Sequence, residues 1–152
     1  MERAWIHHTG LTVRDLDRSV AFYRDVVGME LVMQQEKRGG YLGAIVGYPD
    51  AHVRQAHLAF PGGGHRLELF QYLHPEGQGE PGEPRDVGIT HVCLVVEDVH
   101  AAAERLRAAG AELYSDPVFV DTGANAGGYG VYLRDPDGIT LELFQPREEG
   151  GS

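Results

Sequence analysis

Cysteine is nearly absent from this sequence, since Cys93 is the only one among 152 residues. A single cysteine excludes a disulfide within the chain and is typical of a reducing compartment. Cys93 lies in the apolar run Val-Cys-Leu-Val-Val. We therefore expect a buried structural thiol rather than a nucleophile.

Long apolar runs and clusters of basic residues are also missing. No run approaches the roughly 18 residues of a membrane-spanning helix, and the opening Met-Glu-Arg-Ala-Trp lacks the apolar segment of a secretory signal. We therefore expect a cytoplasmic protein without a membrane partner. The formal net charge is -10 and the 13 Lys and Arg residues are scattered, which argues against a nucleic-acid partner.

What the sequence does contain is an internal repeat. Residues 8–15 and 91–98 both fit the pattern His-x-x-Leu-x-Val-x-Asp, and residues 67–71 and 141–145 are both Leu-Glu-Leu-Phe-Gln. Each half therefore opens with a histidine motif and closes with a glutamate motif. Two motifs that recur in the same order indicate two copies of one structural unit.

Each half has the pattern of a strand, a helix and further strands. In the first half the helix begins after Asp15 or Asp17 and ends at Gly28, and the expected strands are 6–13, 29–35, 41–47, 53–60 and 65–72. In the second half the helix begins after Asp98 and ends at Gly110, and the expected strands are 89–96, 111–115, 117–121, 129–134 and 139–145. The sequence thus predicts an α+β fold of two βαβββ modules within a single domain, 1–152. The module bounds are about 5–73 and 88–146, with a linker at 74–87 and a flexible tail at 147–152.

Strand alternation predicts where the side chains of the repeated motifs point. The leucines and valines of these strands face the helix, and the polar motif residues face the other way; these are His8, Glu68, His91 and Glu142. If the two sheets curve toward each other, the four converge on one cavity. A single strand histidine or glutamate is usually an ordinary surface or core residue, but the same pair in the same place twice favours a metal site.

Two imidazoles and two carboxylates suit one divalent metal, namely Ni²⁺, Zn²⁺, Fe²⁺, Co²⁺ or Mn²⁺. Four protein ligands leave two octahedral positions for water or substrate. His7 lies next to His8, but the repeat aligns His8 with His91. The other histidines have no repeat partner, and among them we expect His57 to contact a ligand.

These residues resemble the vicinal oxygen chelate superfamily of glyoxalases, bleomycin resistance proteins and extradiol dioxygenases. The resemblance rests on residues 8–23, 88–98 and 135–144 and spans about residues 5 to 146. It implies paired modules that form a cupped mixed sheet around a metal cavity, and a homodimer. Glyoxalase I and the CoA epimerases use all four ligand positions, extradiol dioxygenases use a His, His, Glu triad, and drug-binding resistance proteins have lost the ligands. This chain keeps all four.

The resemblance therefore implies a metal-dependent enzyme that transfers a proton on a small, oxygen-rich carbonyl substrate chelated to the metal: an isomerase, an epimerase or a lyase. Glu142 or Glu68 would be a ligand that also acts as the base. Asp50 is a second candidate base, because similar CoA epimerases carry one just before the strand at 53–60; a turn residue after Pro49 is its ordinary role. The alternatives are an Fe(II) extradiol-type dioxygenase and a non-catalytic small-molecule-binding or antibiotic-resistance protein.

Substrate contacts are expected from both halves. Phe70 follows Glu68 on the same strand face, and the polar loop at 121–129 offers Asn125 or Tyr129, although a plain linking turn explains its glycines equally well. The chain shows no basic cluster for a CoA phosphate and no glutathione-binding set. A small sugar-like, cyclitol or keto-acid substrate is therefore as credible as the larger ones.

Overall fold

The computed structural model describes residues 3–148, which form two compact units divided between Gly79 and Glu80. The boundary between the units falls inside the predicted linker at 74–87, and the last four residues of the predicted tail lie outside the described residues. Each unit is a sheet with a helix along one face, so the predicted α+β class is confirmed. None of the helices between residues 3 and 148 is both long enough and apolar enough to cross a membrane.

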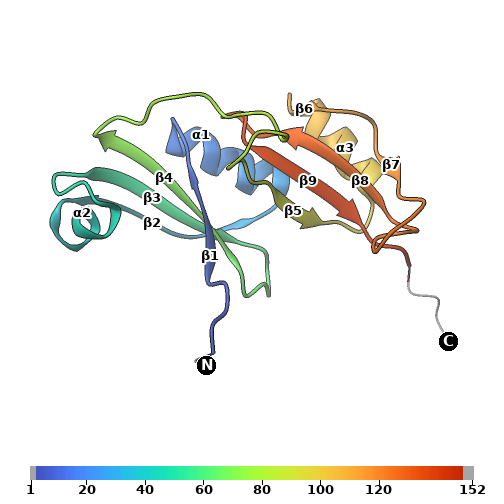
Figure 1. Ribbon diagram of the computed structural model, residues 1–152, viewed down its shortest axis with the longest axis horizontal. Coiled ribbons are helices and arrows are strands. Elements are labelled where there is room, and N and C mark those ends of the chain that lie inside the picture. Colours follow the sequence, from blue (N-terminus) through green and yellow to red (C-terminus); the bar gives the residue numbers. More distant parts are fainter. Residues whose placement is uncertain (1–2, 149–152) are drawn as a thin grey trace. The chain divides into compact units, whose positions relative to one another are not determined.

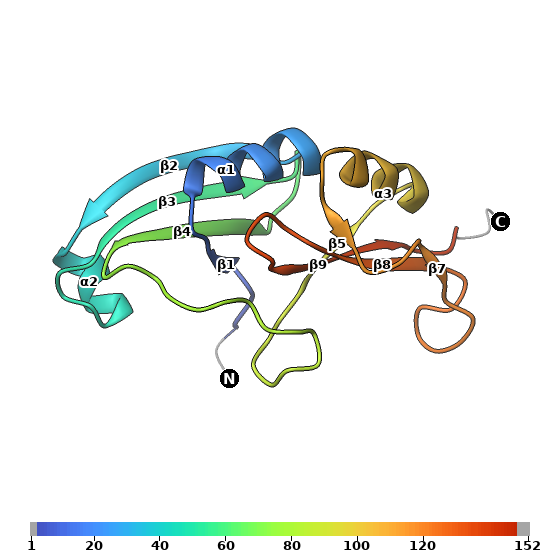
Figure 2. The ribbon, with the colours of Figure 1, turned by 90° about the horizontal axis from the view of Figure 1, so that it is seen from above.

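The sheet of the first unit has the order β1-β4-β3-β2. Its strands are β1 (His8–Thr12), β2 (Glu30–Arg38), β3 (His52–Ala59) and β4 (Arg66–His74). β1 runs parallel to β4, and the other pairs are antiparallel. Helix α1 (Leu16–Ala21) continues as the wider turn η1 (Phe22–Val27) and lies along one face of this sheet (Figure 2). We call the face opposite α1 the open face.

The second unit repeats this plan. Its sheet has the order β5-β9-β8-β6, with strands β5 (Val92–Val95), β6 (Glu112–Leu113), β8 (Tyr129–Arg134) and β9 (Thr140–Gln145). A further short strand, β7 (Val118–Phe119), also pairs with β8. β6 and β7 therefore both pair with β8, at different positions along it. Helix α3 (Val99–Ala108) covers one face, and the opposite face is the open face of this unit (Figure 1).

The repeat extends to individual hydrogen bonds. Asp15 caps α1 by accepting from the backbone N–H of Arg18, and Asp98 caps α3 by accepting from that of Ala101. The glutamine that ends each Leu-Glu-Leu-Phe-Gln motif accepts a hydrogen bond from the first backbone N–H of the helix. Gln71 accepts from Leu16, and Gln145 accepts from Val99. Each helix start is thereby tied to its closing strand.

Strand alternation placed the apolar side chains correctly. Leu67 and Leu69 of β4 are buried toward α1, and Leu141 and Leu143 of β9 are buried in the second unit. These leucines form the core under each helix together with residues such as Tyr23, Leu58, Leu106 and Leu133. The glutamate between each pair of leucines consequently faces the open side.

The predicted strand at 41–47 is wrong, because this segment forms helix α2 (Gly40–Val46). Leu42 and Val46, four residues apart, lie on one helical face and pack against Val53 and Phe70. Gly43 makes this packing possible, since a Cβ there would lie only 2.5 Å from the carbonyl oxygen of Pro49. With this correction, the first unit has the predicted order βαβββ plus an inserted helix.

Candidate metal centre

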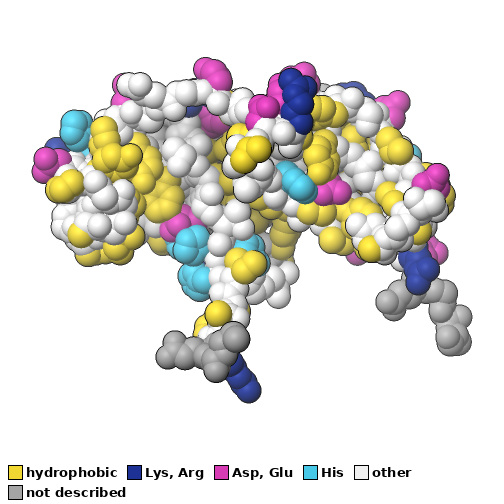
Figure 3. Space-filling model, viewed as in Figure 1, with side chains coloured by type: hydrophobic (Ala, Val, Ile, Leu, Met, Phe, Trp, Pro, Cys, Tyr) yellow, Lys and Arg dark blue, Asp and Glu magenta, His cyan; other side chains and the backbone are white. Residues whose placement is uncertain are grey.

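His8 and Glu68 form a close pair on the open face of the first unit. Glu68 is buried, and its Oε2 lies 3.1 Å from His8 Nε2. The strands hold this contact, because β1 and β4 pair in a register that places Gly10 beside Glu68. Gly10 has no side chain to separate His8 from the carboxylate. Figure 3 shows histidine side chains gathered beside an acidic one on this part of the surface, near β1.

His91 and Glu142 form the same pair in the second unit. Glu142 Oε2 lies 3.1 Å from His91 Nε2, which is the spacing and the choice of atoms found in the first unit. Here β5 and β9 pair so that Cys93 lies beside Glu142, in the place of Gly10. The four residues predicted as ligands are therefore arranged as two equivalent pairs.

The spacing within each pair suits two ligands of one ion. Two ligand atoms on neighbouring corners of an octahedron, each about 2.1 Å from the metal, lie about 3.0 Å apart. An imidazole nitrogen and a carboxylate oxygen are also ligand types that divalent transition metals accept. Between residues 3 and 148, however, no three or more His, Cys, Asp or Glu side chains gather into a group that could hold a metal. Each unit by itself thus brings one histidine and one glutamate together at this spacing.

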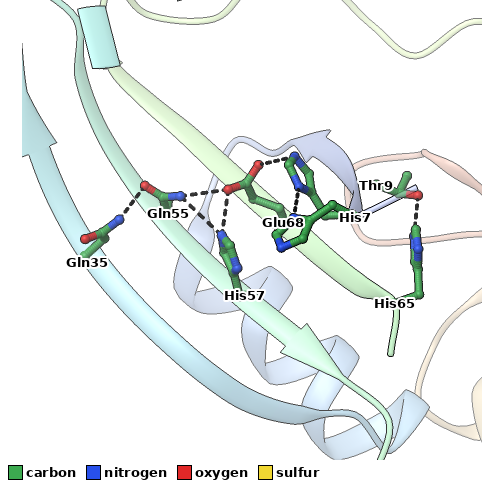
Figure 4. A network of polar contacts seen from close by, with 8 residues as sticks. His7, Thr9, Gln35, Gln55, His57, His65 and Glu68 are labelled. Atoms are coloured by element: carbon green, nitrogen blue, oxygen red, sulfur yellow. Dashed lines mark hydrogen bonds and ion pairs between the residues drawn. The ribbon is translucent and has the colours of Figure 1, made fainter. Parts of the chain in front are cut away.

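Glu68 is held by further donors on its other oxygen (Figure 4). Gln55 Nε2 donates to Glu68 Oε1 at 2.8 Å, and His57 Nε2 lies 2.6 Å from the same atom. The Gln55 side-chain carbonyl in turn accepts from Gln35 Nε2 at 2.8 Å. Gln55 and His57 are both buried, so these contacts are shielded from water. His57, predicted as a substrate contact, is thus bonded to Glu68.

Glu142 has a different neighbourhood. Tyr132 takes the register position of His57, but its hydroxyl lies 3.2 Å from His91 Nε2. Gly130 takes the position of Gln55, and it brings no side chain to Glu142. Burial and the Glu142 carboxylate both raise the pKa of the Tyr132 hydroxyl, which keeps it protonated at neutral pH.

Cys93 corrects one prediction, because its side chain is exposed rather than buried. It lies on the open face beside Glu142, while its neighbours in β5 turn toward the helix side. Desolvation, and secondarily the Glu142 carboxylate, raise the pKa of the Cys93 thiol to about 11. The thiol is therefore protonated at neutral pH, and a protonated thiol is a poor nucleophile.

Other predicted residues of the first unit surround its pair. Phe70 lies on the open face but packs with Tyr72, at 6.1 Å between ring centroids, against the helix α2. His7 contacts the His8 ring through their Nδ1 atoms, and His65 bonds the Thr9 hydroxyl at 2.8 Å. Asp50 is exposed in the turn after α2, and β3 begins only at His52, about 17 Å along the strand from His57. Asp50 is therefore not brought to Glu68.

The predicted contacts in the loop 121–129 are not gathered with Glu142. Tyr129 shares a strand face with the buried Val131, and its ring packs against His100 of α3, with 5.3 Å between centroids. It consequently lies on the helix side of the sheet, opposite Glu142. Asn125 is exposed and accepts from the backbone N–H of Gly128.

Sequence reasoning missed Gln55 and Tyr132 as neighbours of the glutamates. Alternation alone puts Gln55 on the same face as His57, but the pairing of β3 with β4 is needed to bring both to Glu68. The pairing of β8 with β9 brings Tyr132 to Glu142 in the same way. Neither register is visible in the sequence.

Comparison with known proteins identifies the family. Residues 5–143 match the Glyoxalase/Bleomycin resistance protein/Dioxygenase superfamily. The chain belongs to this superfamily. It is 34% identical over 142 residues to a 2-epi-5-epi-valiolone epimerase from Actinomyces, covering 91% of this chain and 78% of the relative. It is 32% identical over 144 residues to a lactoylglutathione lyase from Haemophilus influenzae, covering 92% and 91% of the two chains.

A solved structure supports the fold assignment. A glyoxalase family protein from Bacillus cereus aligns with a TM-score of 0.86 at 24% identity, covering 97% of each chain. The superfamily resemblance predicted from the two motifs is thus confirmed. The sequence relatives are named as an epimerase and a lyase, which supports an enzyme of the glyoxalase/epimerase type.

Proposed function

We propose that His8, Glu68, His91 and Glu142 together hold one divalent metal, and that the protein is a metal-dependent proton-transfer enzyme. The observation that carries this proposal is the repetition of one His–Glu pair, with the same atoms at the same 3.1 Å spacing, on the open face of each unit. Superfamily members typically use a divalent metal, which agrees with the imidazole and carboxylate ligands of each pair.

The reaction we propose is epimerisation, isomerisation or a lyase step at the carbon beside a carbonyl. A bound metal would polarise that carbonyl and its neighbouring oxygen and so make the adjacent C–H acidic enough for a carboxylate to take its proton. Glu142 suits the role of base, because Gly130 leaves it without the amide donor that Gln55 gives Glu68. Glu142 would take the proton and return it to carbon.

Among substrates, we propose a small sugar-like or cyclitol ketone as the first class to test. The relative with 34% identity is named as an epimerase of 2-epi-5-epi-valiolone. The chain carries a net charge of -10 and its 13 basic residues are scattered, which disfavours a multiply phosphorylated carrier such as CoA. The predicted homodimer and cytoplasmic location stay predictions.

Two measurements test the function. Metal analysis of the purified protein should find one divalent ion per chain, and His91→Ala should lose it. Turnover of 2-epi-5-epi-valiolone, or of the glutathione hemithioacetal of methylglyoxal, in D₂O without oxygen should place deuterium at the carbon beside the carbonyl. Turnover that requires oxygen contradicts proton transfer and supports the dioxygenase. Turnover that shows neither deuterium from D₂O nor a primary isotope effect with substrate deuterated at that carbon also contradicts proton transfer. Ligand binding without metal or turnover supports a binding protein.

A further inference from the structure

The two glutamates differ in how many donors hold them, although their strands and histidines are equivalent. Glu68 Oε1 accepts hydrogen bonds from Gln55 Nε2 at 2.8 Å and from His57 Nε2 at 2.6 Å, while Oε2 faces His8. The Glu68 side chain is 9% exposed and that of Glu142 is 22% exposed. The first carboxylate is therefore the more buried and the more firmly bonded.

The donors of Glu68 are arranged in a line across three strands. Gln35 of β2 donates its amide hydrogen to Gln55 of β3, which donates its own to Glu68 of β4. Donation through Nε2 leaves the other ring nitrogen of His57, Nδ1, buried and without a hydrogen-bond partner among residues 3–148. A buried polar atom without a partner is costly. The His57 ring nevertheless stays hydrogen-bonded to Glu68, although its Nδ1 has no partner among the described residues.

We propose that Gln35 and Gln55 are positioning residues that, with His57, keep Glu68 Oε1 occupied and present Oε2 beside His8 Nε2 for the metal. Gln35 donates to Gln55, and Gln55 and His57 both donate to Glu68 Oε1. Glu68 Oε1 is therefore the final acceptor of these hydrogen bonds. Glu68 would then act as a fixed ligand through one oxygen. This inference rests on the proposed metal site and adds to it the residues that orient one ligand.

The role of Gln55 can be tested by Co²⁺ binding to the full-length protein, followed by competition with a chelator and by the visible spectrum of the bound ion. Gln55→Leu removes both the amide donor and the acceptor of Gln35 at similar volume. We expect Co²⁺ affinity to fall about 10- to 100-fold, as is usual when an outer-shell partner is lost. We also expect a changed spectrum, because Glu68 Oε1 then keeps only the His57 donor and the carboxylate is held less firmly.

Gln34 provides a matched control. It is the neighbour of Gln35 in β2, it is exposed, and it points to the opposite face, where it bonds Asp17. Gln34→Leu makes the same chemical change as Gln35→Leu at the neighbouring position of β2. We expect this variant to keep wild-type Co²⁺ affinity and spectrum. Gln35→Leu should lower the affinity by less than about tenfold, since it acts through Gln55. In the Gln55→Leu background it should add no further loss.

The outcomes separate this inference from the proposed function. If the wild-type protein binds no Co²⁺, or if His8→Ala binds it as well as the wild type, the metal site itself fails. If His8→Ala loses the ion while folded Gln55→Leu keeps wild-type affinity and spectrum, the positioning role is wrong and the metal site stands. Should Gln55→Leu not fold, Gln35→Leu decides: wild-type affinity and spectrum in that variant overturn the line of donors.

Discussion

The first and second units share one plan, and they differ where the glutamates sit. Both cap their helix with an aspartate, tie it with a glutamine and hold a histidine 3.1 Å from a carboxylate. Around Glu68 the neighbouring strand supplies Gln55 and His57, whereas around Glu142 it supplies Gly130 and Tyr132. The shared features build the fold and the ligand pairs. The differing ones suggest that one carboxylate is anchored and the other is left free to move.

The largest expected effect comes from replacing the two glutamates in turn. At saturating metal, Glu142→Gln should lower kcat about 10³-fold, because it removes the proposed base. Glu68→Gln should mainly weaken metal binding and keep more of kcat once metal is saturating. Steady-state kinetics over a metal titration measures both. Equal losses of kcat in the two variants would contradict the assignment of distinct roles.

A second expected effect concerns the equivalent cores. Leu69 and Leu143 are both buried under their helices and pair with the corresponding strands β1 and β5. Leu69→Ala and Leu143→Ala should each lower the free energy of unfolding by about 3 kcal/mol. Urea denaturation followed by circular dichroism tests this, with Val32→Ala at an exposed position as the control. A cost confined to one variant would show that the two cores are not equivalent.

A third variant makes the second unit resemble the first. A Cβ at Gly130 would meet Glu142 Oε1 at 3.7 Å, an ordinary contact, and the position corresponds to Gln55. Gly130→Gln should place an amide donor on Glu142 and lower kcat about tenfold while metal affinity stays within a few-fold, because a restrained base moves less readily. Gly130→Ala, which adds bulk without a donor, is the control. If both variants lose the same activity, bulk rather than donation is responsible.

The smallest expected effect concerns Cys93, which takes the place that Gly10 has in the first unit. Partial desolvation and the Glu142 carboxylate raise the pKa of this exposed thiol from 9.0 to about 11, so about 100-fold less thiolate is present below pH 9. Greater nucleophilicity of that thiolate recovers about tenfold of the rate. Metal-free protein should therefore react with iodoacetamide at pH 8 about tenfold more slowly than N-acetylcysteine, with a rate that keeps rising above pH 9.

The contribution of Glu142 to that pKa can be separated from burial. Glu142→Gln removes the negative charge and should speed alkylation, while Glu68→Gln in the other unit should leave it unchanged. An alkylation rate that levels off near pH 9 in the wild type would contradict the raised pKa.

Much of the fold was predictable because the repeat constrains it twice. The paired motifs fixed the strands that carry His8, Glu68 and Glu142 and placed His91 directly before β5, and alternation fixed the faces of the strand residues. The segment 41–47 was mistaken because a short apolar run fits both periodicities. Its identity as a helix depends on Leu42 and Val46 meeting Phe70 and on Gly43 approaching Pro49.

The immediate surroundings of the glutamates were less predictable. Gln55 and His57 have no matching residue type in the second half of the repeat, because the second unit has Gly130 and Tyr132 at the corresponding positions. Cys93 looked buried because its run is apolar, but β5 is the outer strand of its sheet and turns Cys93 to the open face. Register and edge position, rather than composition, decided these residues.

The motif Leu-Glu-Leu-Phe-Gln has a consequence for how such a chain could arise and diverge. Within five residues it carries two core leucines, the carboxylate and the glutamine that ties the helix, so one short segment contributes to the core, the His–Glu pair and the helix start of a unit. A duplicated gene would therefore inherit a complete half-site in each copy. Later change at the facing strand, as between Gln55 and Gly130, could then give the two halves separate duties without redesigning either scaffold.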